Sequence, residues 1–148
     1  AEAIDPEVEV KLPCVLPEDW IPDTAERLDA YSRFANAGTP PRIRGVLADL
    51  EARYGTAPTE ADNLRRLAEL RLGCRALGIV KLAVLTVRVS LVLHAHHRLD
   101  SMRLLELCTG EPGRFKRQGD MALDVRGTPE ETADPFRCAE WALGRLRG

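Results

Sequence analysis

The sequence lacks the short motifs of several large enzyme classes. It contains no G-x-x-x-x-G-K-[ST] or G-x-G-x-x-G loop, no H-E-x-x-H pair and no G-x-S-x-G elbow. These absences argue against phosphate-loop ATP hydrolysis, zinc-peptidase chemistry and nucleophile-elbow hydrolysis within this segment. The chain also contains no internal repeat and no low-complexity stretch.

An excess of charge of one sign is missing as well. The 21 basic residues are spread among 23 acidic ones, which gives a net charge of −2. No basic face stands out, and this argues against a dedicated nucleic-acid binder. The longest apolar run, near residues 79–93, is broken by Lys81 and Arg88, so we expect no membrane span. No signal peptide opens the chain, and we expect a cytoplasmic protein.

Cysteines are few and far apart. None of the 4 forms a C-x-x-C pair, which favours reduced thiols over a disulfide framework. The first residue is not Met and the opening residues resemble the interior of a folded sequence, so we expect a piece of a longer protein. A length of 148 residues is enough for one domain with a real core.

Several segments have the pattern of strands. Strict alternation predicts a strand at residues 7–12, and the Val- and Leu-rich residues 79–93 predict a long strand or a hairpin whose turn the sequence does not mark. Two short strands are expected at 113–116 and 121–125, around a Gln118-Gly119-Asp120 turn.

Five segments have the apolar periodicity and end signals of helices: residues 24–36, 40–54, 59–77, 101–108 and 135–147. Asp23 is expected to cap the first helix with Glu26 as its capping-box partner. The caps expected for later helices are Thr39, Asp100 or Ser101, and Asp134. The first helix is expected to bury Leu28, Tyr31, Phe34 and Ala35. This order of elements predicts an α+β fold, a single domain with helices packed on a small, mostly antiparallel sheet.

The stretch LPEDWIPDTAER, residues 16–27, contains the adjacent carboxylates Glu18 and Asp19. A small enzyme that used them would need two acids converging on a substrate in a concave pocket, and adjacent side chains diverge. The prolines instead predict a stiff corner that places Trp20 and Ile21 in the core.

The only histidines are His94, His96 and His97. On a strand, His94 and His96 would point to one face, but a zinc site needs at least a third protein ligand and none is nearby in sequence. We expect a strand end that enters a polar loop, with no metal, no cofactor and no catalysis in this segment.

The helix expected at 40–54 has a less ordinary outer face. Opposite its apolar stripe lie Gly45, Ala48, Asp49 and Ala52, with Arg53 beside them. Alanine is a good helix former on any wet surface. The alternative is an interdomain docking face, where small side chains allow close approach and Asp49 meets a basic partner group.

Three further residues are possible interface residues. Arg71 and Arg75 lie one turn apart inside the apolar arc of the helix at 59–77. They either cover core with their stems or form an interface ion pair. Trp141 lies off the apolar stripe of its helix, where it either covers a neighbouring element or anchors a partner.

Three blocks, in this order and spacing, resemble a known family. The run LPEDWIPDTAERLDAYSR is similar to L-P-x-x-Y-I-P-D-x-x-x-R-L-x-x-Y-x-R. It is followed by DLEARYGTAPTEADNL, similar to E-L-x-D-R-F-G-x-x-P-x-x-x-x-N-L, and by LRLGCRALGI, similar to L-R-x-x-A-x-x-L-G-I. Together they resemble the C-terminal domain of bacterial transcription-repair coupling factors, strongly over residues 8–82 and loosely over 83–148.

This resemblance implies a regulatory role inside a larger protein. The parent would be a cytoplasmic ATP-dependent DNA translocase that displaces stalled RNA polymerase and recruits nucleotide excision repair. ATP and Mg would bind its motor domains, outside this segment. The domain would dock on the parent's N-terminal repair-recruiting module and mask it from the damage-recognition ATPase, and would restrain translocation.

The resemblance also bears on the outer face described above. The family's acidic pair falls on Asp49 and Ala52, so this chain keeps one charge and loses the other. The loss implies weaker docking on the N-terminal module, or compensation by other contacts. An alternative function is a DNA-binding accessory domain that uses scattered arginines, Arg42, Arg44, Arg65 and Arg66.

Overall fold

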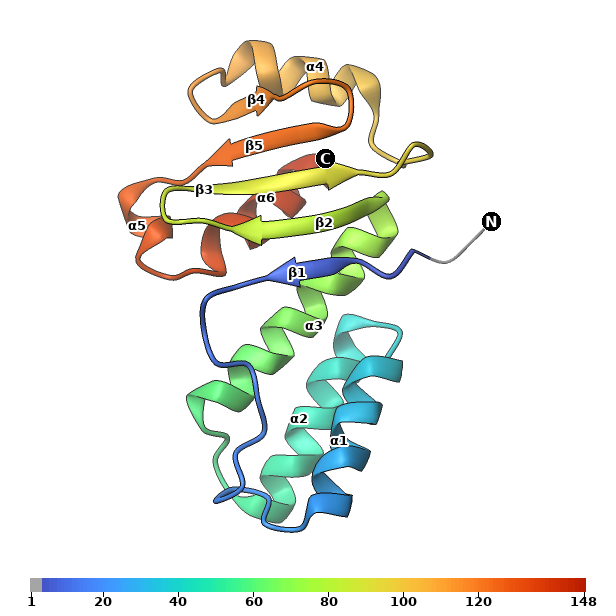
Figure 1. The fold of residues 1–148 in the computed structure, drawn as a ribbon, viewed down its shortest axis with the longest axis vertical. Coiled ribbons are helices and arrows are strands. Elements are labelled where there is room, and N and C mark those ends of the chain that lie inside the picture. Colours follow the sequence, from blue (N-terminus) through green and yellow to red (C-terminus); the bar gives the residue numbers. More distant parts are fainter. Residues whose placement is uncertain (1–3) are drawn as a thin grey trace. The chain divides into compact units, whose positions relative to one another are not determined.

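The computed structural model describes residues 4–148 (Figure 1). Contacts divide the chain into two compact units: Leu12–Leu72, here called the helical unit, and the preceding segment together with Gly73–Gly148, here called the sheet unit. The α+β class is confirmed, and the domain is built from these two units. Within the described residues, no helix has both the length and the apolar character needed to span a membrane.

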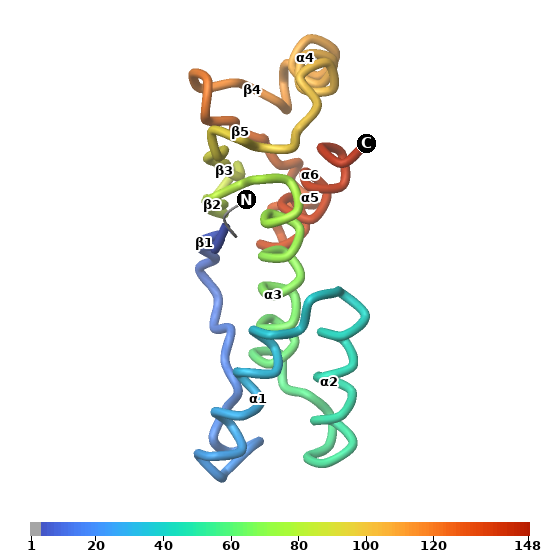
Figure 2. Tube along the Cα trace, turned by 90° about the vertical axis from the view of Figure 1, so that its right-hand side faces the viewer, coloured from blue at the N-terminus to red at the C-terminus, as the bar shows by residue number. Residues whose placement is uncertain are grey.

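The sheet unit contains a mixed, mostly antiparallel sheet. Its strands are β1 (Glu7–Glu9), β2 (Ile79–Val84), β3 (Arg88–Leu93), β4 (Phe115–Arg117) and β5 (Ala122–Arg126), in the order β1-β2-β3-β5-β4. Only the β1–β2 pair is parallel among these strands. The helices of the unit are α4 (Ser101–Gly110), α5 (Pro129–Thr132) and α6 (Arg137–Arg147). Figure 2 shows α5 and α6 on one side of the strands.

Alternation along β3 places the core of this unit. Val89, Leu91 and Leu93 are buried, whereas Arg88 and Val92 are exposed. The inward side chains meet α6, which buries an apolar stripe as its periodicity predicts: Phe136, Ala139, Leu143 and Leu146. Because β2 and β3 pair with each other in antiparallel fashion, the run at 79–93 is a hairpin, and its turn lies at 85–87.

The helical unit is built on α1 (Thr24–Asn36), α2 (Pro40–Tyr54) and the first part of α3 (Thr59–Leu77). All three helices have the bounds that the sequence predicts. The Thr39 hydroxyl accepts from the Arg42 amide at 3.3 Å and begins α2. Gly55, with φ +89°, ends it because a glycine adopts that conformation without steric cost.

The Pro-rich corner is confirmed as scaffold. Ile21 is fully buried and Trp20 packs on the same core. The Leu16 amide donates to the Tyr31 hydroxyl at 2.8 Å. On α3, the buried Asn63 donates to the Pro13 carbonyl at 3.1 Å. These bonds tie the corner to two helices.

Two expectations for α1 are wrong. Asp23 is the N-cap and accepts from the Ala25 amide, but Glu26 does not close a capping box, because its carboxylate accepts from the Tyr54 hydroxyl of α2. The apolar stripe is also displaced. Leu28 is 62 % exposed, while Ala30 and Phe34 are buried, since α1 contacts its neighbours along a narrower strip than the side-chain pattern suggests.

The bounds of several strands and helices in the sheet unit also differ from those expected. Strand β1 stops at Glu9, and β4 begins at Phe115. Helix α5 was not expected: Thr128 and Glu131 form a capping box there, but a four-residue helix is too short to show periodicity. Helix α6 therefore begins at Arg137, and Asp134 accepts from the Phe136 amide just before it.

Candidate docking face on helix α2

The outer side of α2 carries the five residues that the sequence singled out. Gly45, Ala48, Ala52 and Arg53 are exposed, and the side chain of Asp49 is 43 % exposed. The opposite side of the helix buries Ile43, Val46, Leu47 and Leu50. This separation leaves a surface of small side chains with one carboxylate on it, which we call the Asp49 face.

Asp49 is held by a residue that the sequence did not indicate. The Nη1 atom of Arg33, on α1, lies 2.8 Å from the Asp49 Oδ2 atom. This hydrogen bond holds the pKa of the Asp49 carboxyl below its usual range, and the charge of nearby Arg53 acts in the same direction. Arg33 is 16 residues away, so only the packing of α1 on α2 brings the pair together.

Gly45 offers the closest approach on the Asp49 face. A Cβ built there meets no atom within 4 Å. Glycine costs about 1 kcal/mol relative to alanine inside a helix, and no close contact within the described residues requires it. The position is therefore open to a partner that packs closely against the helix.

A shallow depression lies beside the Asp49 face, between α1 and α2. Its volume is about 210 Å³, and its lining includes Arg33, Arg53, Asp29 and Tyr54. Polar and apolar groups contribute about equally to these walls. The depression therefore adds hydrogen-bonding and charged groups next to the face.

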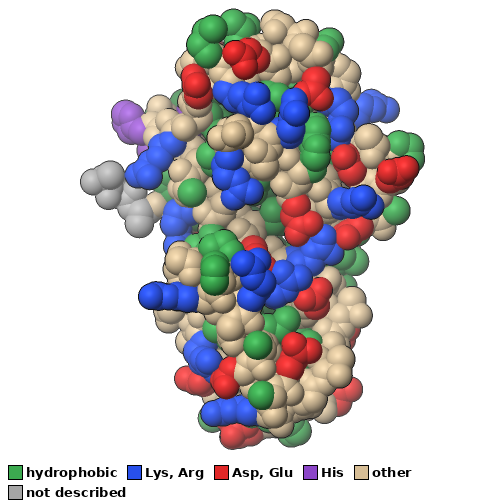
Figure 3. Space-filling model, turned by 180° about the vertical axis from the view of Figure 1, so that it is seen from behind, with side chains coloured by type: hydrophobic (Ala, Val, Ile, Leu, Met, Phe, Trp, Pro, Cys, Tyr) green, Lys and Arg blue, Asp and Glu red, His purple; other side chains and the backbone are tan. Residues whose placement is uncertain are grey.

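Two of the four arginines of the alternative DNA-binding surface pair with acids. Arg44 pairs with Glu69 at 3.1 Å, and Arg65 pairs with both Asp62 and Glu69. Figure 3 shows one face of the molecule, on which Lys and Arg side chains are interspersed with Asp and Glu. Intramolecular pairing of this kind lowers the positive field that phosphate binding requires.

The other interface candidates have partners within the chain. The Arg75 Nε atom donates to the Ile4 carbonyl at 3.1 Å, and Arg71 is exposed. The Trp141 ring lies 5.5 Å from that of Phe115, measured between centroids, and Arg114 stacks 3.7 Å from the Trp141 ring centre. Trp141 thus covers a neighbouring strand, the first of the two alternatives.

Of the candidates for chemistry, the two histidines lie together, whereas the two carboxylates are exposed. The Glu18 side chain is 86 % exposed and Asp19 is exposed too, so neither carboxylate lies in a concave pocket. The rings of His94 and His96 are 5.6 Å apart. Across residues 4–148, no group of three or more His, Cys, Asp or Glu side chains is arranged to hold a metal ion.

Comparison with known proteins now adds family information. Residues 10–104 match the model of the TRCF domain. Over 123 residues, the chain is 34 % identical to the transcription-repair-coupling factor of Myxococcus xanthus, covering 83 % of this chain and 10 % of that protein. It is 41 % identical to the Escherichia coli protein of the same name over 76 residues, 51 % of this chain and 7 % of the relative.

The fold has a solved counterpart. A crystal structure of the C-terminal domain of transcription-repair coupling factor superposes with a TM-score of 0.74 and 12 % identity, covering 97 % of this chain and 94 % of that one. This chain spans about a tenth of the length of the curated relatives described above. Because the TRCF model matches residues 10–104 of 148, the chain belongs to the TRCF domain family found in transcription-repair-coupling factors.

Proposed function

We propose that this chain is a non-catalytic regulatory domain of an ATP-dependent DNA translocase that displaces stalled RNA polymerase and recruits nucleotide excision repair. It docks through the Asp49 face on the N-terminal repair-recruiting module of the same protein. Docking hides the surface that the damage-recognition ATPase binds, and it restrains the motor. The observation that carries the proposal is an exposed helix face of small side chains centred on one oriented carboxylate.

The geometry of the face suits packing against a partner element. Glycine and alanine let two backbones approach closely, and the space above Gly45 is open. The Asp49 Oδ2 atom is taken by Arg33, whereas Oδ1 receives no bond from residues 4–148. A carboxylate accepts more than one donor, so a partner cation can bind Oδ1.

The charge on the face limits how strongly the domain docks. Arg33 neutralises much of the Asp49 charge, Ala52 supplies none, and Arg53 adds a positive charge. A basic partner surface therefore gains less here than it would from two free carboxylates. We propose that docking is weak and readily reversed, and that shape contributes more to it than charge.

The direct test uses the 148-residue chain and the parent's separate N-terminal module. Titration at low salt is expected to show association, and Gly45→Gln should weaken it about tenfold or more because a long side chain blocks close packing. Gly144→Gln is the matched control, since Gly144 is also an exposed helical glycine with no atom within 4 Å of an added Cβ, but lies on α6. Absence of association by the wild-type pieces, or equal effects of the two variants, contradicts docking through this face.

A second test uses the full-length parent. Asp49→Arg is expected to release the domain, and so to raise both ATPase activity and binding of the damage-recognition ATPase. If deletion of the whole domain leaves both quantities unchanged, the regulatory role is wrong. A salt-dependent gel shift by the isolated chain, lost on Arg42→Glu, would instead support the DNA-binding alternative.

A further inference from the structure

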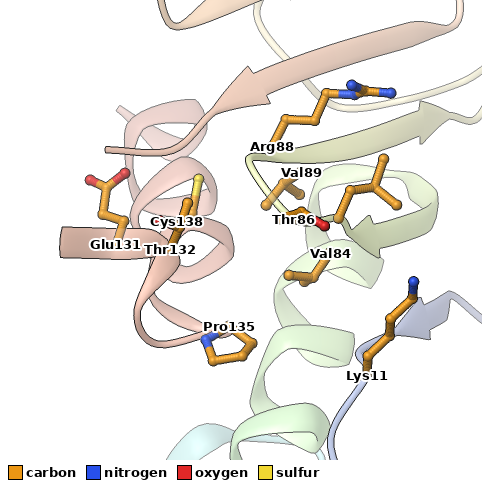
Figure 4. A pocket seen from close by; sticks show the side chains of 10 residues that line it. Lys11, Val84, Thr86, Arg88, Val89, Glu131, Thr132, Pro135 and Cys138 are labelled. Carbon is orange, nitrogen blue, oxygen red and sulfur yellow. The ribbon is translucent and has the colours of Figure 1, made fainter. Parts of the chain in front are cut away.

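The sheet has a second face, opposite the side on which α5 and α6 lie (Figure 2). On the helix side, Val89 of β3 and Val125 of β5 are buried. Because successive side chains of a strand point to opposite faces, Arg88 and Arg126 lie on the other face. Figure 4, a close view of the pocket between the β2–β3 hairpin and α6, shows the Arg88 side chain pointing away from Cys138. We call this second face the open sheet face.

Three cations gather on the open sheet face. Arg88 on β3 lies directly opposite Arg126 on β5, and Lys116 on β4 lies directly opposite Asp124 of β5. The Arg88 side chain is 50 % exposed, and Lys116 and Arg126 are exposed as well. We call Arg88, Lys116 and Arg126 the basic patch. Like charges directly opposite on neighbouring strands are unfavourable, so the two arginines cost the fold stability that a bound anion would restore.

One carboxylate, that of Asp124, lies within the basic patch. Its Oδ2 atom is 3.7 Å from the Arg88 Nε atom and accepts from the Gln118 side-chain amide at 3.3 Å. Lys116 and Arg126 form no ion pair within residues 4–148. Three positive charges against one negative charge leave an excess of two positive charges at the patch.

The other acids of the open sheet face lie at its far edge. Glu7 and Glu9 are on β1, and Glu9 pairs with Lys81 of β2 at 3.5 Å. Three strand spacings separate β1 from β5, which amounts to about 14 Å. This separation exceeds the Debye length of about 8 Å at physiological salt. The basic patch therefore keeps a positive potential of its own.

The layout of the basic patch favours a polyanion over a small anion. Its cations lie on three neighbouring strands, β3, β5 and β4, so they are spread over about 10 Å. Several anionic groups are needed to reach all of them. Ser90, the next residue of β3 on this face, is small and polar, whereas protein recognition sites usually centre on a large apolar or aromatic anchor.

Among polyanions, the patch suits the backbone of a nucleic-acid duplex. Arginine, lysine and serine side chains are common donors to phosphate oxygens. Binders of single strands add exposed aromatic rings on which bases stack, but the aromatic ring of β4, that of Phe115, is buried on the helix side of the sheet. The basic patch thus offers contacts to phosphates and none of this stacking.

We propose that the basic patch binds the phosphate backbone of duplex DNA without reading its sequence. Phosphate contacts of this kind position a protein on DNA and carry no sequence information. Only three cations take part, so the contact is weak and auxiliary, in keeping with the balanced charge of the chain. The proposal goes beyond docking through the Asp49 face and does not depend on it, because the basic patch belongs to the sheet unit.

The test is a fluorescence-anisotropy titration of a labelled DNA duplex of about 20 base pairs with the 148-residue chain. We expect weak binding at low salt. A plot of log association constant against log salt concentration should have a slope of about −3, as counterion release by three phosphate contacts requires. Absence of binding at low salt overturns the proposal. Displacement of the duplex by polyglutamate at equal charge concentration also overturns it, because an acidic protein segment would then fit as well.

Variants locate the contact on the open sheet face. Arg88→Gln and Arg126→Gln are each expected to weaken binding about threefold and to make the slope shallower by about 1. Asp124→Asn is expected to tighten binding, because it removes the one carboxylate of the patch. Weaker binding by Asp124→Asn, together with unchanged binding by both arginine variants, would contradict the assignment.

A matched control separates the basic patch from general electrostatics. Arg137→Gln removes the same charge at an exposed position of α6, on the helix side of the sheet, and is expected to leave the slope unchanged. Equal weakening by Arg137→Gln and Arg126→Gln contradicts a specific patch. Binding that is lost on Arg42→Glu but kept by Arg126→Gln would assign DNA to the arginines of the helical unit and overturn the proposal.

Discussion

Arg33 on α1 donates to Asp49 on α2, with 2.8 Å between Nη1 and Oδ2. This bond orients the only carboxylate of the Asp49 face, and it also weakens the attraction of that carboxylate for a basic partner. The two effects act on docking in opposite directions. Removal of the Arg33 side chain therefore tests whether the charge of Asp49 or its orientation matters more to docking.

We expect Arg33→Gln and Asp49→Asn to change docking in opposite directions. Removing the Arg33 charge frees the Asp49 carboxylate and should tighten association with the N-terminal module about threefold, whereas Asp49→Asn should weaken it by a similar factor. Calorimetric titration at low salt measures both. If both variants weaken association, the orientation that Arg33 provides matters more than the charge that it cancels.

The Arg33–Asp49 pair should also make stability depend on pH. The pKa of Asp49 is lowered in the folded chain, so the unfolded chain takes up the proton first as pH falls. The contribution of the pair is present above pH of about 4, the ordinary pKa of an aspartate, and is lost as pH falls through the lowered folded value. Urea unfolding of the wild type and of Asp49→Asn should differ at pH 7 and converge in acid. A constant difference at all pH values would contradict this assignment.

Gly45→Ala separates folding from docking. No atom lies within 4 Å of the added Cβ, so the change should stabilise the isolated chain by about 0.5–1 kcal/mol through helix propensity. Chemical unfolding measures this gain. Destabilisation would mean that Gly45 contributes to the fold itself, and the proposal that it serves close approach would lose its support.

Gly78 and Gly119 form a matched pair with different surroundings. Both have positive φ, +78° and +85°, but a Cβ at Gly78 would lie 2.6 Å from the His97 Cα atom, whereas one at Gly119 meets nothing within 4 Å. We expect Gly78→Ala to cost more than about 2 kcal/mol and Gly119→Ala about 1 kcal/mol. Equal losses in thermal unfolding would show that conformation alone, without the close approach of the loop after β3, decides the cost.

Tyr31→Phe tests the scaffold role of the Pro-rich corner. The change removes the acceptor for the amide of buried Leu16 and should cost about 1–2 kcal/mol of unfolding free energy. Tyr54→Phe is the control, since the Tyr54 hydroxyl donates to the exposed Glu26 and should change stability by less than about 0.5 kcal/mol. A smaller effect for Tyr31→Phe than for Tyr54→Phe would contradict the role of this bond.

Much of the local structure could be predicted from residue order alone. Helices α1, α2 and α3 have the predicted bounds because their signals are local: Asp23 and Thr39 as caps, Gly55 and Gly78 as stops, and an apolar residue every three to four positions. The α+β class followed from the order of these elements. The outer face of α2 was also predictable, because helical geometry alone places Gly45, Ala48 and Asp49 on one side.

Only the tertiary structure decided which distant residues meet. Glu26 bonds Tyr54 instead of its own helix end, and Arg33 bonds Asp49, because α1 packs on α2. On α3, Asn63 likewise bonds the Pro13 carbonyl, 50 residues away in the chain. Periodicity and capping act within a few residues, whereas these contacts depend on how whole elements pack. The sequence by itself therefore determined the elements and the face, and packing determined the charge on that face.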